Sequence, residues 1–98
     1  MKVHHDDADL ERLESDPEFT AGLDKGLVRA FCKVLNLARG VSNEVGLYKW
    51  RGLNFEKLKG KRAHQRSIRL NDQWRLIVEI EEEDDGNVLV VKGIEDYH

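Results

Sequence analysis

The spacing of apolar residues changes near Phe55, and this change limits how the chain can fold. Before that residue, apolar side chains recur three and four positions apart, which is typical of helices with one buried face. From Phe55 onward they recur every second position, which is typical of strands with one buried face. We therefore expect helices in the first half of the chain and strands in the second.

Two helices are predicted. Asp6 or Asp7 can cap the first, which carries Leu10 and Leu13 on one face. Pro17 ends it, because a proline disfavours helical geometry in the residue before it. The second is expected from Asp24, a suitable cap, to about Arg39, followed by Gly40 in the left-handed conformation that often ends a helix. Its apolar stripe is wide and is interpreted as core: Leu27, Val28, Ala30, Phe31, Val34, Leu35, Leu37, Ala38 and Val41.

Two segments have alternative interpretations. Residues 1–5 form either a short edge strand or a frayed tail, and residues 41–53 are either irregular or carry a short helical turn. In the second segment, Tyr48 and Trp50 are expected to pack between helix and sheet, with stacking on nucleic-acid bases as the alternative.

Residues 67–70 and 74–80 are predicted to be strands joined by a turn, and the length of the turn decides their register. A two-residue loop would pair Leu70 with Gln73 and separate the apolar side chains. A three-residue loop pairs Leu70 with Trp74 and Arg69 with Arg75. Only the second register gathers one apolar face, made of Ile68, Leu70, Trp74, Leu76, Val78 and Ile80. It also sets two arginines side by side, which costs stability and therefore indicates an anion-binding surface.

The remaining C-terminal residues divide into a turn and a strand. Residues 81–87 are expected to be an acidic loop that turns at residues 85–87, and residues 88–94 a last, partly buried strand. The four residues after that strand should have fixed directions because the strand positions them.

Charge is strongly segregated, although the net charge is only −3. Acidic residues gather in the first eighteen positions and again at residues 79–85. Between them, residues 55–75 carry two acids, Glu56 and Asp72, against seven bases: Lys57, Lys59, Lys61, Arg62, Arg66, Arg69 and Arg75. This distribution predicts one positive face, which would attract phosphate or an acidic protein.

Length and composition exclude several classes of protein. The 98 residues, 40% of them hydrophobic, predict a single domain over residues 1–98. No membrane span or signal peptide is expected. The single cysteine, Cys32, excludes an internal disulfide and fits the reducing cytoplasm. His4 and His5 lack further ligands nearby, so neither a metal nor a cofactor is expected.

Three segments together resemble a known family: the basic LKG, the run SIRLNDQWRL and the terminal DYH. They are the pattern of the HigB-like branch of the RelE/ParE superfamily, the toxins of bacterial type II toxin–antitoxin pairs. The resemblance covers roughly residues 27–98. It implies an α+β fold with two N-terminal helices packed on a twisted antiparallel β-sheet of three to four strands. It further implies a ribosome-dependent mRNA endonuclease acting in the ribosomal A site, with mRNA, the 70S ribosome and a HigA-like helix-turn-helix antitoxin as partners.

The resemblance also assigns roles to residues. The last three residues match a triplet in which the family places catalytic side chains. Lys59 matches the lysine of LKG, and Arg75 matches an arginine that faces the scissile phosphate. Glu56 stands where some HigB members have a histidine, and it resembles the glutamate taken as general base in the YoeB branch.

RNA cleavage by the adjacent 2′-hydroxyl without a metal needs a base, cations around the phosphate and an acid. The predicted catalytic residues are Glu56 as base, Lys59 and Arg75 on the phosphate, His98 as acid and Tyr97 as a stacking or donating group. The predicted RNA contacts are Lys57, Lys61, Arg62, Arg66, Arg69 and Asp96. Strict alternation puts Glu56 and Lys59 on opposite faces, so they can share a site only if the chain bends, which Gly60 permits.

Two other functions compete with this one. The first is a ParE-like toxin that inhibits DNA gyrase without cleaving RNA. The second is a basic binding module that docks an acidic partner and breaks no bond. The set of Glu56, Lys59, Arg75 and His98 favours the nuclease, because neither alternative needs it.

Overall fold

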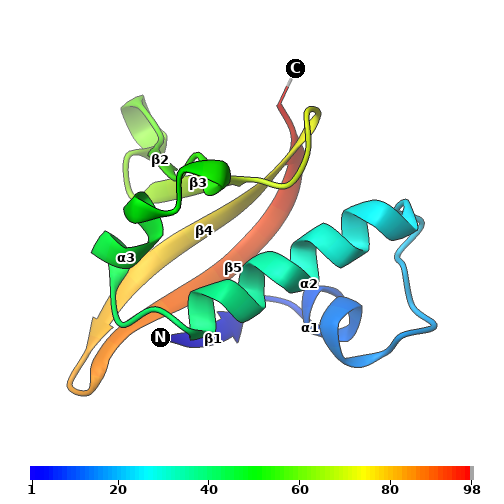
Figure 1. Ribbon diagram of the computed structural model, residues 1–98, viewed down its shortest axis with the longest axis horizontal. Coiled ribbons are helices and arrows are strands. Elements are labelled where there is room, and N and C mark those ends of the chain that lie inside the picture. Colours follow the sequence, from blue (N-terminus) through cyan, green and yellow to red (C-terminus); the bar gives the residue numbers. More distant parts are fainter. Residues whose placement is uncertain (98) are drawn as a thin grey trace.

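A five-stranded sheet lies on one side of the molecule, and helices cover one of its faces (Figure 1). The computed structural model describes residues 1–97, so the prediction for His98 lies outside the described residues. The strands, ordered β1-β5-β4-β3-β2 in the sheet, are β1 (Lys2–His5), β2 (Glu56–Lys57), β3 (Gln65–Arg69), β4 (Trp74–Glu83) and β5 (Gly86–Asp96). The helices are α1 (Ala8–Ser15), α2 (Lys25–Arg39) and α3 (Glu44–Lys49), with single 3-10 turns η1 (Arg51–Leu53) and η2 (Gly60–Arg62).

The α+β class and the two N-terminal helices are confirmed, whereas the predicted antiparallel sheet of three to four strands is wrong. The sheet is mixed, because β1 pairs in parallel with β5 while the other pairs are antiparallel. The reason lies in β5, where residues 88–91 are all buried. A strand buried on both faces is typical of the interior of a sheet, so it needs a neighbour on each side. Residues 2–5 supply that neighbour, which settles their alternative in favour of an edge strand.

The helix caps follow the sequence prediction. Asp7 caps α1 by accepting a hydrogen bond from the backbone N–H of Leu10 at 2.9 Å. Asp24 caps α2 by accepting from Gly26 and Leu27. The prediction for Gly40 is wrong: its φ of −84° is right-handed, because its N–H closes a tight turn on the carbonyl of Leu37. Within residues 1–97, no helix combines the length and apolarity needed to cross a membrane.

The three-residue turn and its register are confirmed. Arg69 lies opposite Arg75 and Ile68 lies opposite Leu76. The resulting apolar face packs against α2 in one core that contains Phe31, Leu35, Ala38, Ile68, Leu76, Val78, Leu89 and Val91. Trp74 belongs to the predicted apolar face but is neither part of this core nor packed against it.

A bulge on β5 keeps this core continuous. Ile77 pairs with Gly93 while Val78 pairs with Val91, so Lys92 is the extra residue. Side chains alternate along a strand, and residues 91 and 94 would otherwise face opposite sides. With the bulge, both point into the core.

Two surface segments differ from expectation. The acidic run is strand rather than loop, because β4 continues to Glu83 and β5 begins at Gly86, leaving a turn at residues 84 and 85. Backbone pairing does not need apolar side chains at the end of a hairpin. Residues 41–53 carry α3 and η1. There the Tyr48 ring meets the Phe55 ring edge-on, with centroids 4.7 Å apart, yet Tyr48 is 50% exposed and Trp50 is 54% exposed.

Candidate functional site

The candidate site lies on the sheet face turned away from α1 and α2. Residues opposite each other on neighbouring strands point to the same face. One such row across the sheet is Glu56, Ser67, Ile77 and Gly93, and the next is Arg69, Arg75 and Glu95. Both rows alternate with the core row of Ile68, Leu76 and Ile94 and therefore face away from the core.

A hollow of about 190 Å³ opens on this face. Residues from β2 to the end of β5 line it: Leu58, Arg62, Ser67, Arg75, Ile77, Glu95, Asp96 and Tyr97. It unites residues far apart in the sequence because β3, β4 and β5 are neighbours in the sheet.

Arg75 and Tyr97 form the centre of the hollow. The guanidinium carbon of Arg75 lies 4.3 Å from the centroid of the Tyr97 ring, which is a cation–π contact. The backbone N–H of Tyr97 donates to the carbonyl of Gln73 at 2.7 Å. This bond ties the chain beyond β5 to the β3–β4 turn, and the two lie at the same end of the molecule in Figure 1. Arg75 also donates to the carbonyl of Asn54, at 3.4 Å.

An ion pair lies on the rim. Arg62, carried by η2, donates through both terminal nitrogens to the two carboxylate oxygens of Glu95, at 3.0 and 2.7 Å. Its Nε donates to the side-chain oxygen of Gln65 at 2.9 Å, which fixes the plane of the guanidinium. The hydrogen bonds to Glu95 raise the pKa of Arg62 above its ordinary value, so the group is a permanent cation.

Ser67 lies in the wall of the hollow and is 1% exposed. Within residues 1–97, its Oγ finds no hydrogen-bond partner. Most buried polar side-chain atoms in proteins are paired, so this hydroxyl stands out.

The other predicted residues occupy different places. Glu56 shares the row of Ser67 and is exposed, whereas Lys57 shares the row of Arg66 on the other face. The strand ends at Lys57, and the chain then bends through Gly60, whose φ is +65°. A bend near Gly60 was the condition that the sequence analysis set for Glu56 and Lys59 to share a site. Lys59 and Lys61 are exposed on this turn.

Two arginines and an aspartate already have partners. The Nε of Arg66 donates to Glu44 of α3 at 2.7 Å, so this arginine joins the helical side to the sheet instead of facing the hollow. Arg69 forms an ion pair with Asp72. Asp96 accepts a hydrogen bond from the side chain of Gln73 at 3.0 Å.

Sequence reasoning missed two polar residues of the hollow, Ser67 and Glu95. The register contained a signal for Glu95, because a strand pairing with β4 must place some residue beside Arg75. Ser67 gave no such signal, because it lies between Arg66 and Ile68 in the sequence like an ordinary polar residue on the outer face of a strand.

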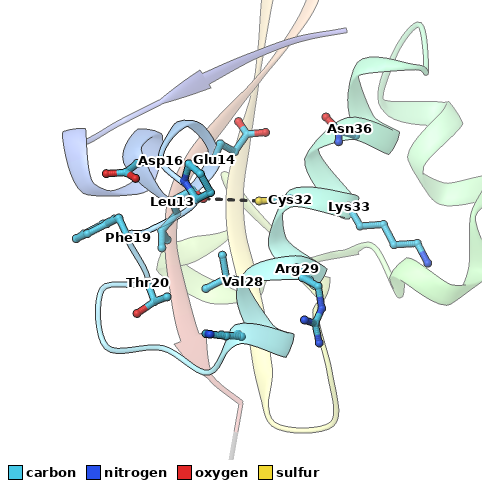
Figure 2. A pocket seen from close by; sticks show the side chains of 12 residues that line it. Leu13, Glu14, Asp16, Phe19, Thr20, Val28, Arg29, Cys32, Lys33 and Asn36 are labelled. Carbon is cyan, nitrogen blue, oxygen red and sulfur yellow. Dashed lines mark hydrogen bonds between the residues drawn. The ribbon is translucent and has the colours of Figure 1, made fainter.

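A larger hollow lies elsewhere and has a different character. About 700 Å³ in volume, it opens between α1, α2 and the segment joining them, and its walls include Leu13, Phe19, Val28 and Cys32 (Figure 2). The Cys32 thiol points to the carbonyl of Leu13 at 3.7 Å, and burial raises its pKa. A protonated thiol is a poor nucleophile, so this hollow offers no evident chemistry. No cluster of metal-binding side chains occurs among residues 1–97.

The comparisons with known proteins bear on the fold. A solved structure described as a YoeB/ParE toxin from Agrobacterium tumefaciens aligns over 100% of both chains, with a TM-score of 0.61 and 19% sequence identity. The two proteins share a fold. No family model matches the chain, and no curated protein is significantly similar to it in sequence. The fold expected from the resemblance is thus supported, and the activity has to be argued from the site.

Proposed function

We propose that this protein is the toxin of a type II toxin–antitoxin pair and acts as a ribosome-dependent mRNA endonuclease. The observation that carries the proposal is the stacking of Arg75 on Tyr97 beside Arg62, in a hollow on a chain with the fold of a YoeB/ParE toxin. A guanidinium fork suits a phosphodiester, and an aromatic ring beside it suits a base.

The proposed reaction is attack of the RNA 2′-hydroxyl on the adjacent phosphorus in the ribosomal A site. Glu56 removes the hydroxyl proton, Arg75 and Lys59 stabilise the charge that develops on the phosphoryl oxygens, and His98 protonates the leaving 5′ oxygen. Tyr97 stacks on a base or donates its hydroxyl. The exposed position of Glu56 in the row of Ser67 and the bend at Gly60 are compatible with this arrangement.

The remaining basic residues are proposed to hold the RNA backbone. Exposed lysines and arginines around a site contact phosphates without reading the sequence. Lys57, Lys61, Arg62 and Arg69 stay in this proposed set. Asp96, an acid, is proposed to contact the RNA site by orienting its neighbour Tyr97 instead of binding a phosphate. Arg66 is its weakest member, because binding RNA would require it to leave Glu44.

A toxin of this kind requires a silencing partner, and we include one in the proposal. The partner is a HigA-like helix-turn-helix antitoxin encoded beside the toxin, and the toxin acts in the cytoplasm, on mRNA bound to the 70S ribosome. A short reading frame for such a protein next to this one would support this part of the proposal.

The test compares two arginines that each stack on an aromatic ring. Arg75 lies 4.3 Å from the Tyr97 centroid, and Arg12 lies 4.1 Å from the Phe19 centroid, far from the hollow. We expect Arg75→Ala to lower mRNA cleavage about 10²–10³-fold, the usual cost of removing one group that stabilises developing charge. Arg12→Ala should cleave like the wild type.

Cleavage is measured by primer extension on mRNA after induction and on programmed ribosomes with purified protein. Circular dichroism confirms that both variants fold. New 5′ ends that persist in folded Arg75→Ala would contradict the proposal. If the wild type gives no new ends while DNA supercoiling is lost, the gyrase inhibitor is correct instead. Tight ribosome binding without cleavage would indicate a binding module.

A further inference from the structure

The side chain of Ser67 is a buried polar group in the wall of the hollow. Its hydroxyl is buried, lines the hollow and has no partner among the described residues. Leaving a buried hydroxyl unpaired costs stability, and an alanine of similar shape would avoid that cost. Its neighbours in the row are the exposed Glu56 on β2 and the apolar Ile77 on β4, and neither of them accepts a hydrogen bond from the hydroxyl. A polar group kept in such a place is best explained by a ligand that pairs with it.

The rim supplies the second observation. Glu95 lies directly opposite Arg75 in the sheet, yet its carboxylate is bound by the fork of Arg62. Both side chains of the pair are nearly half exposed, at 46% and 48%. The bidentate geometry makes this pair stronger than an ordinary surface ion pair, but water can solvate both exposed groups when they part.

The Glu95 carboxylate and an RNA phosphate are alike as ligands of an arginine. A carboxylate and a phosphate present the same pair of oxygens to a guanidinium fork. Arg62 thus already binds an anion, and that anion is part of the chain. The Ser67 Oγ is closed to solvent in this state, so a ligand can reach it only when the hollow opens.

We propose that a phosphodiester of RNA displaces the Glu95 carboxylate from Arg62, and that Arg62, Arg75 and the Ser67 hydroxyl then bind its non-bridging oxygens. This inference rests on the proposed function, because it names how that site takes its substrate. Glu95 acts as an internal competitor that occupies the guanidinium of Arg62 in the absence of RNA. Ser67 donates the hydrogen bond that the free protein leaves unmade.

The experiment measures binding of the full-length protein to a short single-stranded RNA, to DNA of the same sequence and to inorganic phosphate, by fluorescence anisotropy and by NMR titration. Glu95→Gln keeps the shape and removes the competing charge, so RNA affinity should rise roughly two- to fivefold. Glu82→Gln is the matched control, because it removes one exposed acid from β4 near the far end of the β4–β5 hairpin. It should leave affinity unchanged.

A double-mutant cycle tests whether the gain in affinity comes from displacing Glu95 from Arg62. In an Arg62→Gln background the gain from Glu95→Gln should vanish, because no fork remains to compete for. A gain that persists there would overturn the displacement and indicate general electrostatics. An equal gain for phosphate alone would show a phosphate site without preference for RNA, and would overturn the assignment of the ligand as a phosphodiester of RNA.

Ser67→Ala tests the hydroxyl with two readouts. RNA affinity should fall about three- to tenfold, the usual range for a lost hydrogen bond, while the melting temperature stays the same or rises. A purely structural serine would change the melting temperature downward and leave affinity alone, and that result would overturn the role of Ser67. If Arg75→Ala abolishes cleavage but Glu95→Gln and Ser67→Ala bind RNA as the wild type does, the function stands and this inference fails.

Discussion

Two arginine–glutamate pairs in this protein have almost the same geometry in opposite surroundings. Arg39 donates to both carboxylate oxygens of Glu14, each at 2.7 Å, and Arg62 does the same to Glu95 at 3.0 and 2.7 Å. Glu14 is only 15% exposed, whereas Glu95 is 48% exposed. The first pair links α1 to α2, and His5 of β1 joins it through Nε2, 2.8 Å from the carboxylate.

The difference shows that geometry alone does not tell what an ion pair does. A poorly hydrated carboxylate depends on its partners, so removing one of them leaves a charge that water cannot fully compensate. An exposed carboxylate is hydrated whether or not it is paired. The Glu14 pair therefore stabilises the junction of three elements, while the Glu95 pair is free to exchange its anion.

The largest expected difference between the Glu14 pair and the Glu95 pair is in their contribution to the free energy of unfolding. We expect Glu14→Gln to lower the free energy of unfolding by about 1–3 kcal/mol, because Arg39 and His5 lose a partly buried charged acceptor. Glu95→Gln should leave the unfolding midpoint unchanged. Urea titrations followed by circular dichroism measure both. Equal losses of unfolding free energy in the two variants would show that the difference in burial does not change what the two pairs contribute to stability.

The pH dependence of stability gives a smaller effect at the same pair. Hydrogen bonds from Arg39 hold the pKa of Glu14 below its ordinary value. A carboxyl with a lower pKa in the folded state stabilises the fold above its unfolded pKa, and this stabilisation disappears as the pH falls through the folded pKa. We therefore expect the stability gap between wild type and Glu14→Gln to have its full size above about pH 5 and to shrink as the pH falls below about 4.

Urea midpoints measured at several pH values between 3 and 7 test this prediction. A gap that stays constant over that range would mean that Glu14 acts through packing rather than charge. Glu95→Gln serves as the control, since its midpoint should follow that of the wild type at each pH.

Local rules explain what the sequence predicted correctly. Capping needs only a side chain and the next three backbone N–H groups, so Asp7 and Asp24 were identifiable. Register followed from the requirement that one face be apolar, which set Arg69 beside Arg75. The anion-binding surface expected from that pair stays a prediction, and the row that would form it also contains Glu95.

Long-range pairings explain what the sequence did not predict. The partner of β1 is β5, more than eighty residues away, and no local pattern specifies a parallel neighbour. Arg66 belongs to the basic stretch by composition, but the pleat turns it towards Glu44. The same limit applies to Glu14, whose two partners come from elements on either side of α1.

The smallest expected effect uses Cys32 as a reporter of the Glu14 pair. Burial raises the pKa of the thiol most, the negative charge of Glu14 raises it further, and Arg39 lowers it. Removing the charge in Glu14→Gln leaves the opposing influence of Arg39, so the pKa of Cys32 should fall. Alkylation rates by iodoacetamide, measured from pH 7 to 11, give the pKa as the midpoint and the accessibility of the thiol as the plateau. Because a more open protein would also lower the pKa by relieving burial, the change in midpoint is attributed to charge only when the plateau is unchanged. Glu95→Gln, remote from the thiol, should leave the midpoint in place. A midpoint that does not move in Glu14→Gln would mean that solvent screens the thiol from the charge of Glu14.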